Sequence, residues 1–309
     1  MLSQPTSRIY TLLPYAILAL FGLITTVYAL YKIIKIQKFQ SPFGLLLKAL
    51  FLNVILYLVT ILFWLSIRIL FDVNSLMENY SRYVGIFFIF TWYFSEFITV
   101  AISSNRFIAI AFPIYYRNEI TIDKTKIIVG VISTVTLCLT ISSLIGKNIY
   151  KILISIIIES CSMNYNIKTL TWSFPNSWCG KLYAFWFQFI GGIVIIIISL
   201  IIDTSTLLSL IHRKQHSTVF KTNVKKHISI VRQDVLFFCQ SFLQNIKTLL
   251  IVVSINVFTR LIDSIYGKFY FRTFSWCLCH VLDVIIIILF NKELWRINKC
   301  RPISQVTFY

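Results

Sequence analysis

Six ionisable side chains stand within or at the end of long apolar stretches of this 309-residue chain, and they are the first candidates for a functional role. They are Lys48, Glu96, Arg106, Asp203, Lys247 and Asp283. If these stretches cross a lipid bilayer, each buried charge costs at least about 2.5 to 3.5 kcal/mol, so such residues are expected to pair or to act. Lys48 is the exception, because it lies near a predicted helix end and its long side chain can reach the polar interface.

Glu96 and Lys247 are expected to lie at similar depths. Glu96 precedes Arg106 by ten residues, about 15 Å along a helix, and Lys247 is thirteen residues into its apolar stretch, about 20 Å in. This predicts an ion pair between Glu96 and Lys247, with Asp283 as a competing partner for the lysine. His280 is grouped with them in an intramembrane polar cluster or ligand pocket. Whether the pair is a fixed packing element or responds to a ligand stays open.

The composition indicates that lipid is the solvent. The chain is 58% hydrophobic and 13% charged, with a mean hydropathy of +0.80, whereas a soluble domain carries about 25% charged residues. A net charge of +18 would suggest nucleic acid in a soluble protein. Here the basic residues lie between apolar stretches, so they indicate membrane topology and contact with anionic lipids, and no nucleic-acid partner is expected.

Seven apolar stretches approach the ~20 residues that a membrane-spanning helix needs. They must be helices, because lipid offers no partner for free backbone groups. The fold predicted is an all-α membrane protein, a seven-transmembrane helix bundle within residues 13–296, preceded by an N-terminal segment, 1–12, and followed by a tail, 297–309. The predicted spans are 13–31, 45–67, 84–110, 127–145, 182–211, 235–258 and 273–290.

The basic residues predict how the bundle is oriented. Of the 29 Lys and Arg, 17 fall in the segments of one side and 10 in those of the other, and two lie inside spans. The segment after the first span, YKIIKIQK, contains no acid, and the first span usually dominates orientation. Since the richer side is normally cytoplasmic, an extracellular N-terminus and a cytoplasmic C-terminus are predicted.

No feature of the sequence indicates an enzyme. The four histidines show no metal-ligand spacing, and the seven cysteines include no C-x-x-C pair. No nucleophile or pair of catalytic carboxylates stands out either. Neither a catalytic residue nor a metal or cofactor is therefore predicted.

Cys161 and Cys179 are the only two cysteines on the predicted outer side, which favours a disulfide that closes this loop, with two free thiols as the alternative. The residues between them suit a short hairpin over a pocket. Asn79 is a glycosylation candidate, since Asn-Tyr-Ser is an acceptor sequence. Cys300, in the basic tail, is a lipidation candidate. Aromatic residues at the outer ends of the spans predict a largely apolar pocket, suited to a volatile or lipid-like ligand.

Four motifs, in order and on the predicted helices, resemble the nematode chemoreceptor family called serpentine receptor class X, which is rhodopsin-like. The resemblance runs from about Gly22 to Arg296. The motifs are FG at Phe43–Gly44 with Asn53 after it, NRFIAIAFPIYY at Asn105–Tyr116, RQDVLFFCQSFLQ at Arg232–Gln244, and WCLCHVLDVIIIILFNKELWR at Trp276–Arg296.

This resemblance implies a chemosensory G-protein-coupled receptor that binds a small external chemical and activates a heterotrimeric G protein inside the cell. It also implies a multi-pass protein of the plasma membrane, in contact with membrane lipids, with the sensory cilium as one candidate location. The alternative is a multipass transporter or a ligand-gated channel subunit. Transporters often show repeated halves, and no internal repeat is visible here.

Arg106, with Asn105 and Phe107 beside it, is the switch residue that the resemblance implies. Most rhodopsin-like receptors have an acid next to this arginine, and Asn105 stands in its place. The acid at the same end of the sixth span is Asp234. We therefore predict that Arg106 and Asp234 face each other in the inactive state and separate on activation. The alternative is that Arg106 only anchors the third helix at the membrane interface.

Overall fold

The computed structural model describes residues 5–70, 76–145, 161–166, 170–217 and 224–295, and the side chains at several helix ends, including 224–234, lie outside this description. Within the described residues, seven helices or continuous helical runs are long and apolar enough to cross a membrane. The predicted seven-helix bundle is therefore confirmed. The runs are α1 (Pro5–Lys35), α2 (Pro42–Leu70), α3 (Leu76–Ala111), α5 (Ile122–Ile145), α7–η2–α8 (Trp178–Ser217), α9–η4–α10 (Val224–Leu261) and α11–η5–α12 (Ile265–Phe290).

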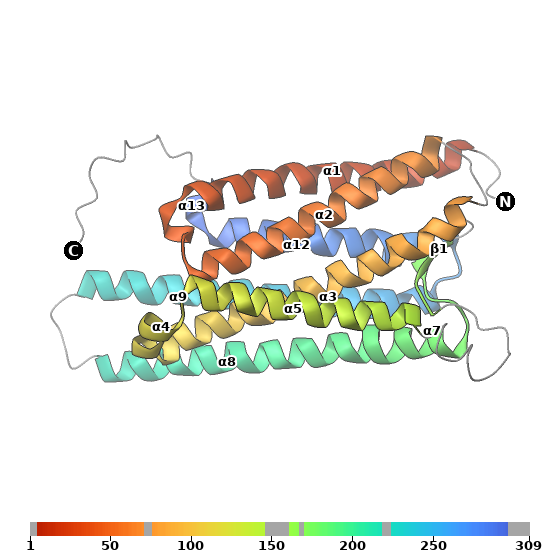
Figure 1. Ribbon diagram of the computed structural model, residues 1–309. Helices are drawn as coiled ribbons and strands as arrows, with labels where there is room; N and C mark the ends of the chain where they lie inside the picture. The colour runs from red at the N-terminus through yellow and green to blue at the C-terminus, as the bar shows by residue number, and fades with distance from the viewer. Residues whose placement is uncertain (1–4, 71–75, 146–160, 167–169, 218–223, 296–309) are drawn as a thin grey trace.

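Helix α3 occupies a central place in the bundle. It packs against α2, α5 and α8, while α12 packs against α1 and α9. The helices run side by side, with the strand β1 and helix α7 at one end and α4 and α13 at the other (Figure 1). We call these the hairpin end and the Arg106 end. The Arg106 end also holds three short helices: η1 (Gln37–Phe39), α4 (Pro113–Glu119) and α13 (Lys292–Trp295).

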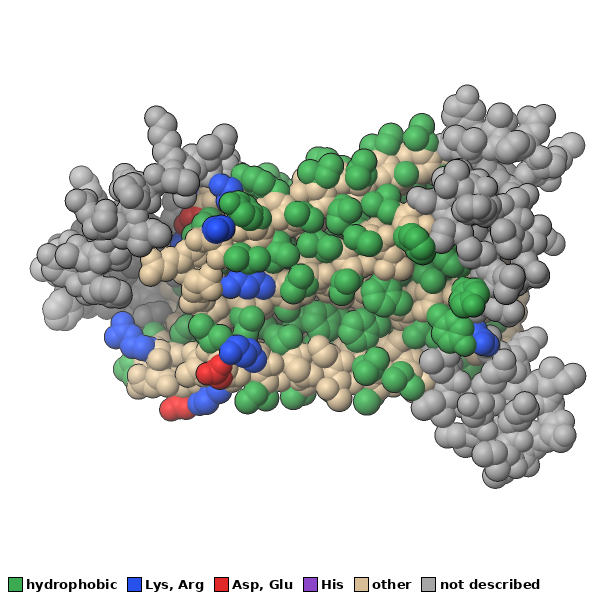
Figure 2. Space-filling view, turned by 45° about the horizontal axis from the view of Figure 1, so that its top comes forward, with side chains coloured by type: hydrophobic (Ala, Val, Ile, Leu, Met, Phe, Trp, Pro, Cys, Tyr) green, Lys and Arg blue, Asp and Glu red, His purple; other side chains and the backbone are tan. Residues whose placement is uncertain are grey.

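The outer surface of the bundle matches a lipid environment. Large hydrophobic side chains stand exposed along the long helices, Ile17, Phe63 and Ile201 among them. Figure 2 shows hydrophobic side chains along the length of the visible face, while most of its charged side chains gather toward one end. Exposure on this scale is unfavourable in water but costs nothing against acyl chains.

Polar contacts hold the interior together. The side-chain amide of Asn53 on α2 donates to the carbonyl of Thr91 (2.8 Å) and to the hydroxyl of Ser95 (2.8 Å), both on α3. The asparagine is buried, so these bonds have no competition from water. They fix how α2 packs on α3, the helix that carries Arg106.

A short hairpin covers one end of the bundle. Strands β1 (Asn164–Asn166) and β2 (Thr171–Ser173) pair antiparallel, as the sequence suggested for this loop. The buried Trp172 contacts Trp64 of α2 and Phe88 of α3. The hydroxyl of Thr273 accepts from the backbone N–H of Trp172 (3.4 Å) and donates to the carbonyl of Leu170 (3.1 Å), which docks the hairpin on the seventh helical run.

Three helical runs contain π-helical segments, and all three segments lie toward the hairpin end. They are η2 (Tyr183–Gly191), η4 (Ser254–Phe258) and η5 (Tyr270–Phe274). A π-helical turn inserts extra backbone into a helix, changes where side chains point, and is frequent at functional sites. The hairpin end therefore differs locally from a regular bundle.

The seventh helical run starts earlier than predicted, at Ile265 and not at Thr273. Lys268 and Arg272 interrupt the apolar pattern, so the sequence placed the helix start after them. In the structure both cations lie in the first turns of the run, where a charged side chain can face polar surroundings instead of acyl chains.

A substitution at Gly85 of α3 tests whether the hairpin loop lies close against this helix. A Cβ at this position would collide with the backbone carbonyl of Met163, whereas a Cβ at Gly130 of α5 would meet nothing within 4 Å. We expect Gly85→Ala to destabilise the protein by about 1 to 3 kcal/mol, seen as a lower melting temperature and lower surface expression. Gly130→Ala should be neutral or slightly stabilising. Equal behaviour of the two variants would show that the hairpin does not sit against α3.

Candidate functional site

An ion pair lies deep in the bundle between α9 and α12. The ammonium group of Lys247 is 2.6 Å from a carboxylate oxygen of Asp283, and the two side chains are only 6% and 5% exposed. The amide of Gln244 donates a longer hydrogen bond, 3.4 Å, to the same oxygen. Among the described residues, Glu96 and Lys247 do not form the direct ion pair that the sequence predicted. Lys247 pairs with Asp283, the competing partner, because α9 packs directly against α12.

Glu96 nonetheless belongs to the same cluster. It is buried on α3 and interacts electrostatically with both Lys247 and Asp283. Two carboxyl groups thus compete for a single lysine inside the membrane-spanning region. For the lysine to exchange one acid for the other, α9 would have to move relative to α3 and α12.

His280 is near this cluster but packs differently. Its ring lies 4.2 Å from the ring of Tyr57, centroid to centroid, and it is almost fully buried. Neither ring nitrogen has a hydrogen-bond partner within the described residues. His280 thus contributes to aromatic packing between α12 and α2, and it does not contact the carboxylate of Asp283 by a hydrogen bond.

Arg106 is buried toward the end of the bundle that lies opposite the hairpin, where it joins α3 to α9. Its guanidinium donates to the carbonyl of Phe237 (3.1 Å) and to the hydroxyl of Ser241 (2.7 Å). It also lies over two rings, 5.0 Å from the ring of Phe43 and 4.8 Å from that of Phe237. A guanidinium held between aromatic faces and neutral acceptors is stabilised without a direct carboxylate contact.

The acidic neighbour of Arg106 in the structure is Asp203 of α8. The two groups interact electrostatically, and Asp203 is buried and accepts a hydrogen bond (2.9 Å) from the amide of Asn245 on α9. Sequence reasoning identified Asp203 as a buried charge but did not assign it to Arg106. The sequence feature that could have led to this assignment is that Asp203 is an acid within the fifth predicted span with no partner assigned to it. Asp234, the predicted partner, belongs to α9, but its side chain lies outside the described residues.

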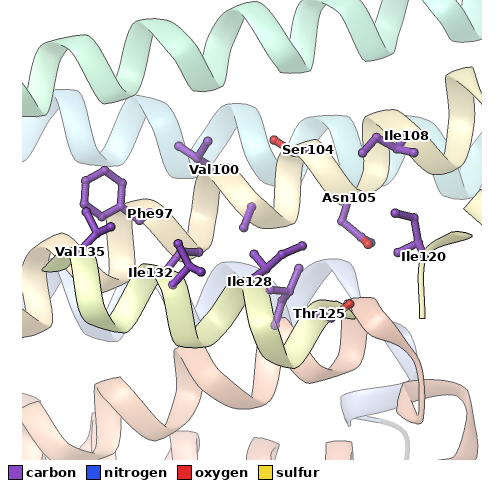
Figure 3. A pocket seen from close by; sticks show the side chains of 13 residues that line it. Phe97, Val100, Ser104, Asn105, Ile108, Ile120, Thr125, Ile128, Ile132 and Val135 are labelled. Atoms are coloured by element: carbon purple, nitrogen blue, oxygen red, sulfur yellow. The ribbon is translucent and has the colours of Figure 1, made fainter. Parts of the chain in front are cut away.

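The neighbours of Arg106 face different surroundings. Asn105 points into a cavity of about 370 Å³ between α3 and α5, which Phe97, Ile128 and Ile132 also line (Figure 3). Phe107 meets Phe112 edge-on, with 6.0 Å between ring centroids. Asn105 and Phe107 therefore do not share the contacts that hold the guanidinium to α9.

The structure joins Cys161 and Cys179 by a disulfide that closes the hairpin loop. Asn79 lies in the first turns of α3, with its side chain outside the described residues, and Cys300 falls outside them altogether. No group of three or more potential metal ligands occurs in the part of the chain that the structure describes.

The pairing of Lys247 can be tested by charge exchange. Lys247→Asp or Asp283→Lys alone places like charges together and should cost about 3 to 5 kcal/mol, seen as lost surface expression and a lower melting temperature. The double exchange should restore much of both. The Glu96→Lys/Lys247→Glu exchange should restore less.

The exposed Lys126–Asp123 pair, 2.7 Å apart, serves as the matched control, because reversing a surface charge should change stability by less than about 1 kcal/mol. Rescue by the Glu96 exchange, without rescue by the Asp283 exchange, would contradict the pairing described.

Comparison with known proteins places this bundle in a family. Residues 17–291 match the family described as "Serpentine type 7TM GPCR chemoreceptor Srx". A curated relative, Serpentine receptor class X 45 of Caenorhabditis elegans, is 22% identical over 304 residues, which cover 91% of this chain and 78% of the relative. The chain belongs to the Srx family of serpentine G-protein-coupled chemoreceptors and is a multi-pass protein of the plasma membrane.

Proposed function

We propose that this chemosensory receptor binds a small external chemical at the hairpin end and activates a heterotrimeric G protein at the Arg106 end. The observation that carries the proposal is the pair of hydrogen bonds from Arg106 to Phe237 and Ser241, which hold α3 to α9. Breaking them would let α9 separate from α3 and open the Arg106 end of the bundle. Such a contact between helices has two discrete states, as a switch requires.

Two observations support an orientation with the hairpin end outside. The Cys161–Cys179 disulfide lies at that end, and disulfides persist in oxidising, extracellular surroundings. In the topology predicted from the sequence, the segments on the side of Arg106 contain 17 of the 29 Lys and Arg, against 10 on the other side, and basic segments favour the cytoplasmic side. An epitope tag at the N-terminus should therefore be accessible to antibody in intact cells, and one at the C-terminus only after permeabilisation.

Helix α9 connects the two ends. Phe237, Ser241, Asn245 and Thr248 recur every three or four residues, so they share one face of the helix. Ser241 contacts α3, and Asn245 contacts α8. Lys247, in the same part of α9, contacts α12. A ligand that shifts α9 at the hairpin end would disturb these contacts together. Asp234, on the same helix, remains our proposed further partner for Arg106 in the inactive state.

Removal of the Ser241 hydroxyl tests the switch. Ser241→Ala deletes a hydrogen bond to a charged group, worth about 1.5 kcal/mol, and should raise ligand-independent signalling about tenfold at matched surface expression. A G-protein reporter assay measures this. Ser142→Ala, which removes an exposed hydroxyl at the hairpin end, is the control and should leave basal signalling unchanged. Basal signalling that does not rise in Ser241→Ala would argue against the switch.

The loss of Arg106 itself tests coupling. Arg106→Ala should reduce the response to a mixed panel of odorants by about tenfold or more, since about 1.4 kcal/mol of stabilisation gives that factor. Lys126→Ala removes an exposed positive charge at the same end and should keep the response. If both variants respond normally at equal surface expression, Arg106 is only an anchor of α3.

A further inference from the structure

A second cavity, of about 310 Å³, opens at the hairpin end. Residues of the hairpin, of the three π-helical segments and of α10 and α11 line it. Its volume is at the lower end of the range for small-molecule sites, about 300 to 1,000 Å³. It is far larger than a single inorganic ion requires.

Three cationic side chains line this cavity: Arg260 of α10, Lys268 of α11 and Arg272 of η5. Its other lining residues are Asn166, Thr171, Ser173, Ala184, Ile255, Asn256 and Thr259, so the lining includes no acid. Arg260 and Arg272 are close enough to repel each other electrostatically. Within the described residues, none of the three cations forms an ion pair. The sequence analysis did not predict a basic cavity at this end.

The cavity also coincides with the irregular backbone of the bundle. Each of the three π-helical segments contributes to the lining, through Ala184 of η2, Ile255 and Asn256 of η4, and Arg272 of η5. Thr273, the residue after Arg272, holds the hairpin through hydrogen bonds with Leu170 and Trp172. The segment that presents Arg272 is thus held by the same contacts that dock the hairpin.

We propose that this cavity binds a small organic anion, a carboxylate-bearing molecule whose charged group lies between Arg260 and Arg272. A carboxylate would relieve the repulsion between the two guanidinium groups and accept bidentate hydrogen bonds from either. Lys268 adds a third positive charge, and Ile255 and Ala184 give apolar surface for a short hydrocarbon part. This inference rests on the proposed function, in which the hairpin end faces outward.

Membrane topology does not account for these cations. Basic residues favour the cytoplasmic side, and the proposed orientation puts this cluster on the other side. The negative surface potential that attracts basic segments belongs to the cytoplasmic leaflet as well. The cluster lies in a cavity beneath the hairpin, where a soluble ligand entering from outside would meet it.

Thermal stability of the purified full-length receptor in nanodiscs tests the proposal without requiring any signalling. The probes are hexanoate and benzoate, compared with hexanamide and benzamide, which are neutral and of similar shape, at constant ionic strength. We expect at least one carboxylate, and neither amide, to raise the melting temperature in a concentration-dependent way. Arg272→Gln should weaken the apparent affinity about tenfold or more, and Arg260→Gln should do the same.

Lys181→Gln is the matched control, because Lys181 is an exposed cation at the same end that does not line the cavity. It should leave the effect of the carboxylates unchanged. If Arg272→Gln does not fold, Arg260→Gln and the charge-retaining Arg272→Lys still decide the matter, since the former should lose binding and the latter keep part of it. No stabilisation by either carboxylate, equal stabilisation by the amides, or equal loss in Lys181→Gln would overturn the proposal.

The G-protein reporter separates this inference from the proposed function. Stabilisation by a carboxylate in a receptor that never signals would leave the anion site standing and refute the coupling. Arg106-dependent responses to odorants, in a receptor that neither carboxylate stabilises, would do the reverse.

Discussion

The arrangement of this receptor depends on the polar inner face of helix α9. Ser241 and Phe237 hold Arg106 of α3, Asn245 holds Asp203 of α8, and Lys247 pairs with Asp283 of α12. In a bilayer the hydrophobic effect does not drive helices together, so such polar contacts and close packing must position them. One helix thereby fixes the relative places of three others.

The buried charges explain why that face matters. Each acid or base of the interior needs a partner, because an uncompensated charge within the bundle is strongly unfavourable. Lys247 satisfies Asp283 while Glu96 stays close to both, and Arg106 relies on neutral acceptors and two rings with Asp203 nearby. In each case an acid interacts with the cation electrostatically without pairing with it directly, so each cation has an alternative partner. A receptor needs that property, since a ligand can shift only an equilibrium between states that differ in their contacts.

The hairpin end supplies the place where a ligand could act on α9. The segment η4 continues α9 and contributes Ile255 and Asn256 to the basic cavity, whereas Ser241 contacts Arg106 toward the other end of the same helical run. Under our proposal, an anion bound between Arg260 and Arg272 would draw together η5 and α10, the helix that directly follows η4. The π-helical backbone there leaves these segments less regular than the rest of the run, so a local rearrangement is cheaper than bending a regular helix.

The sequence by itself determined the fold class and the seven spans, because apolar stretches of about 20 residues have no alternative to helices in lipid. It also determined which buried charges need partners, and it indicated the Cys161–Cys179 loop. Only the tertiary structure decided which charges meet. Hydropathy and helical rise give the depth of Glu96, Lys247 and Asp283 but not the neighbours of α9, so Lys247 was assigned to Glu96 and Asp203 was left without a partner. The basic cavity could not be predicted for the same reason: Arg260, Lys268 and Arg272 line one cavity only because the sixth and seventh helical runs meet at the hairpin end.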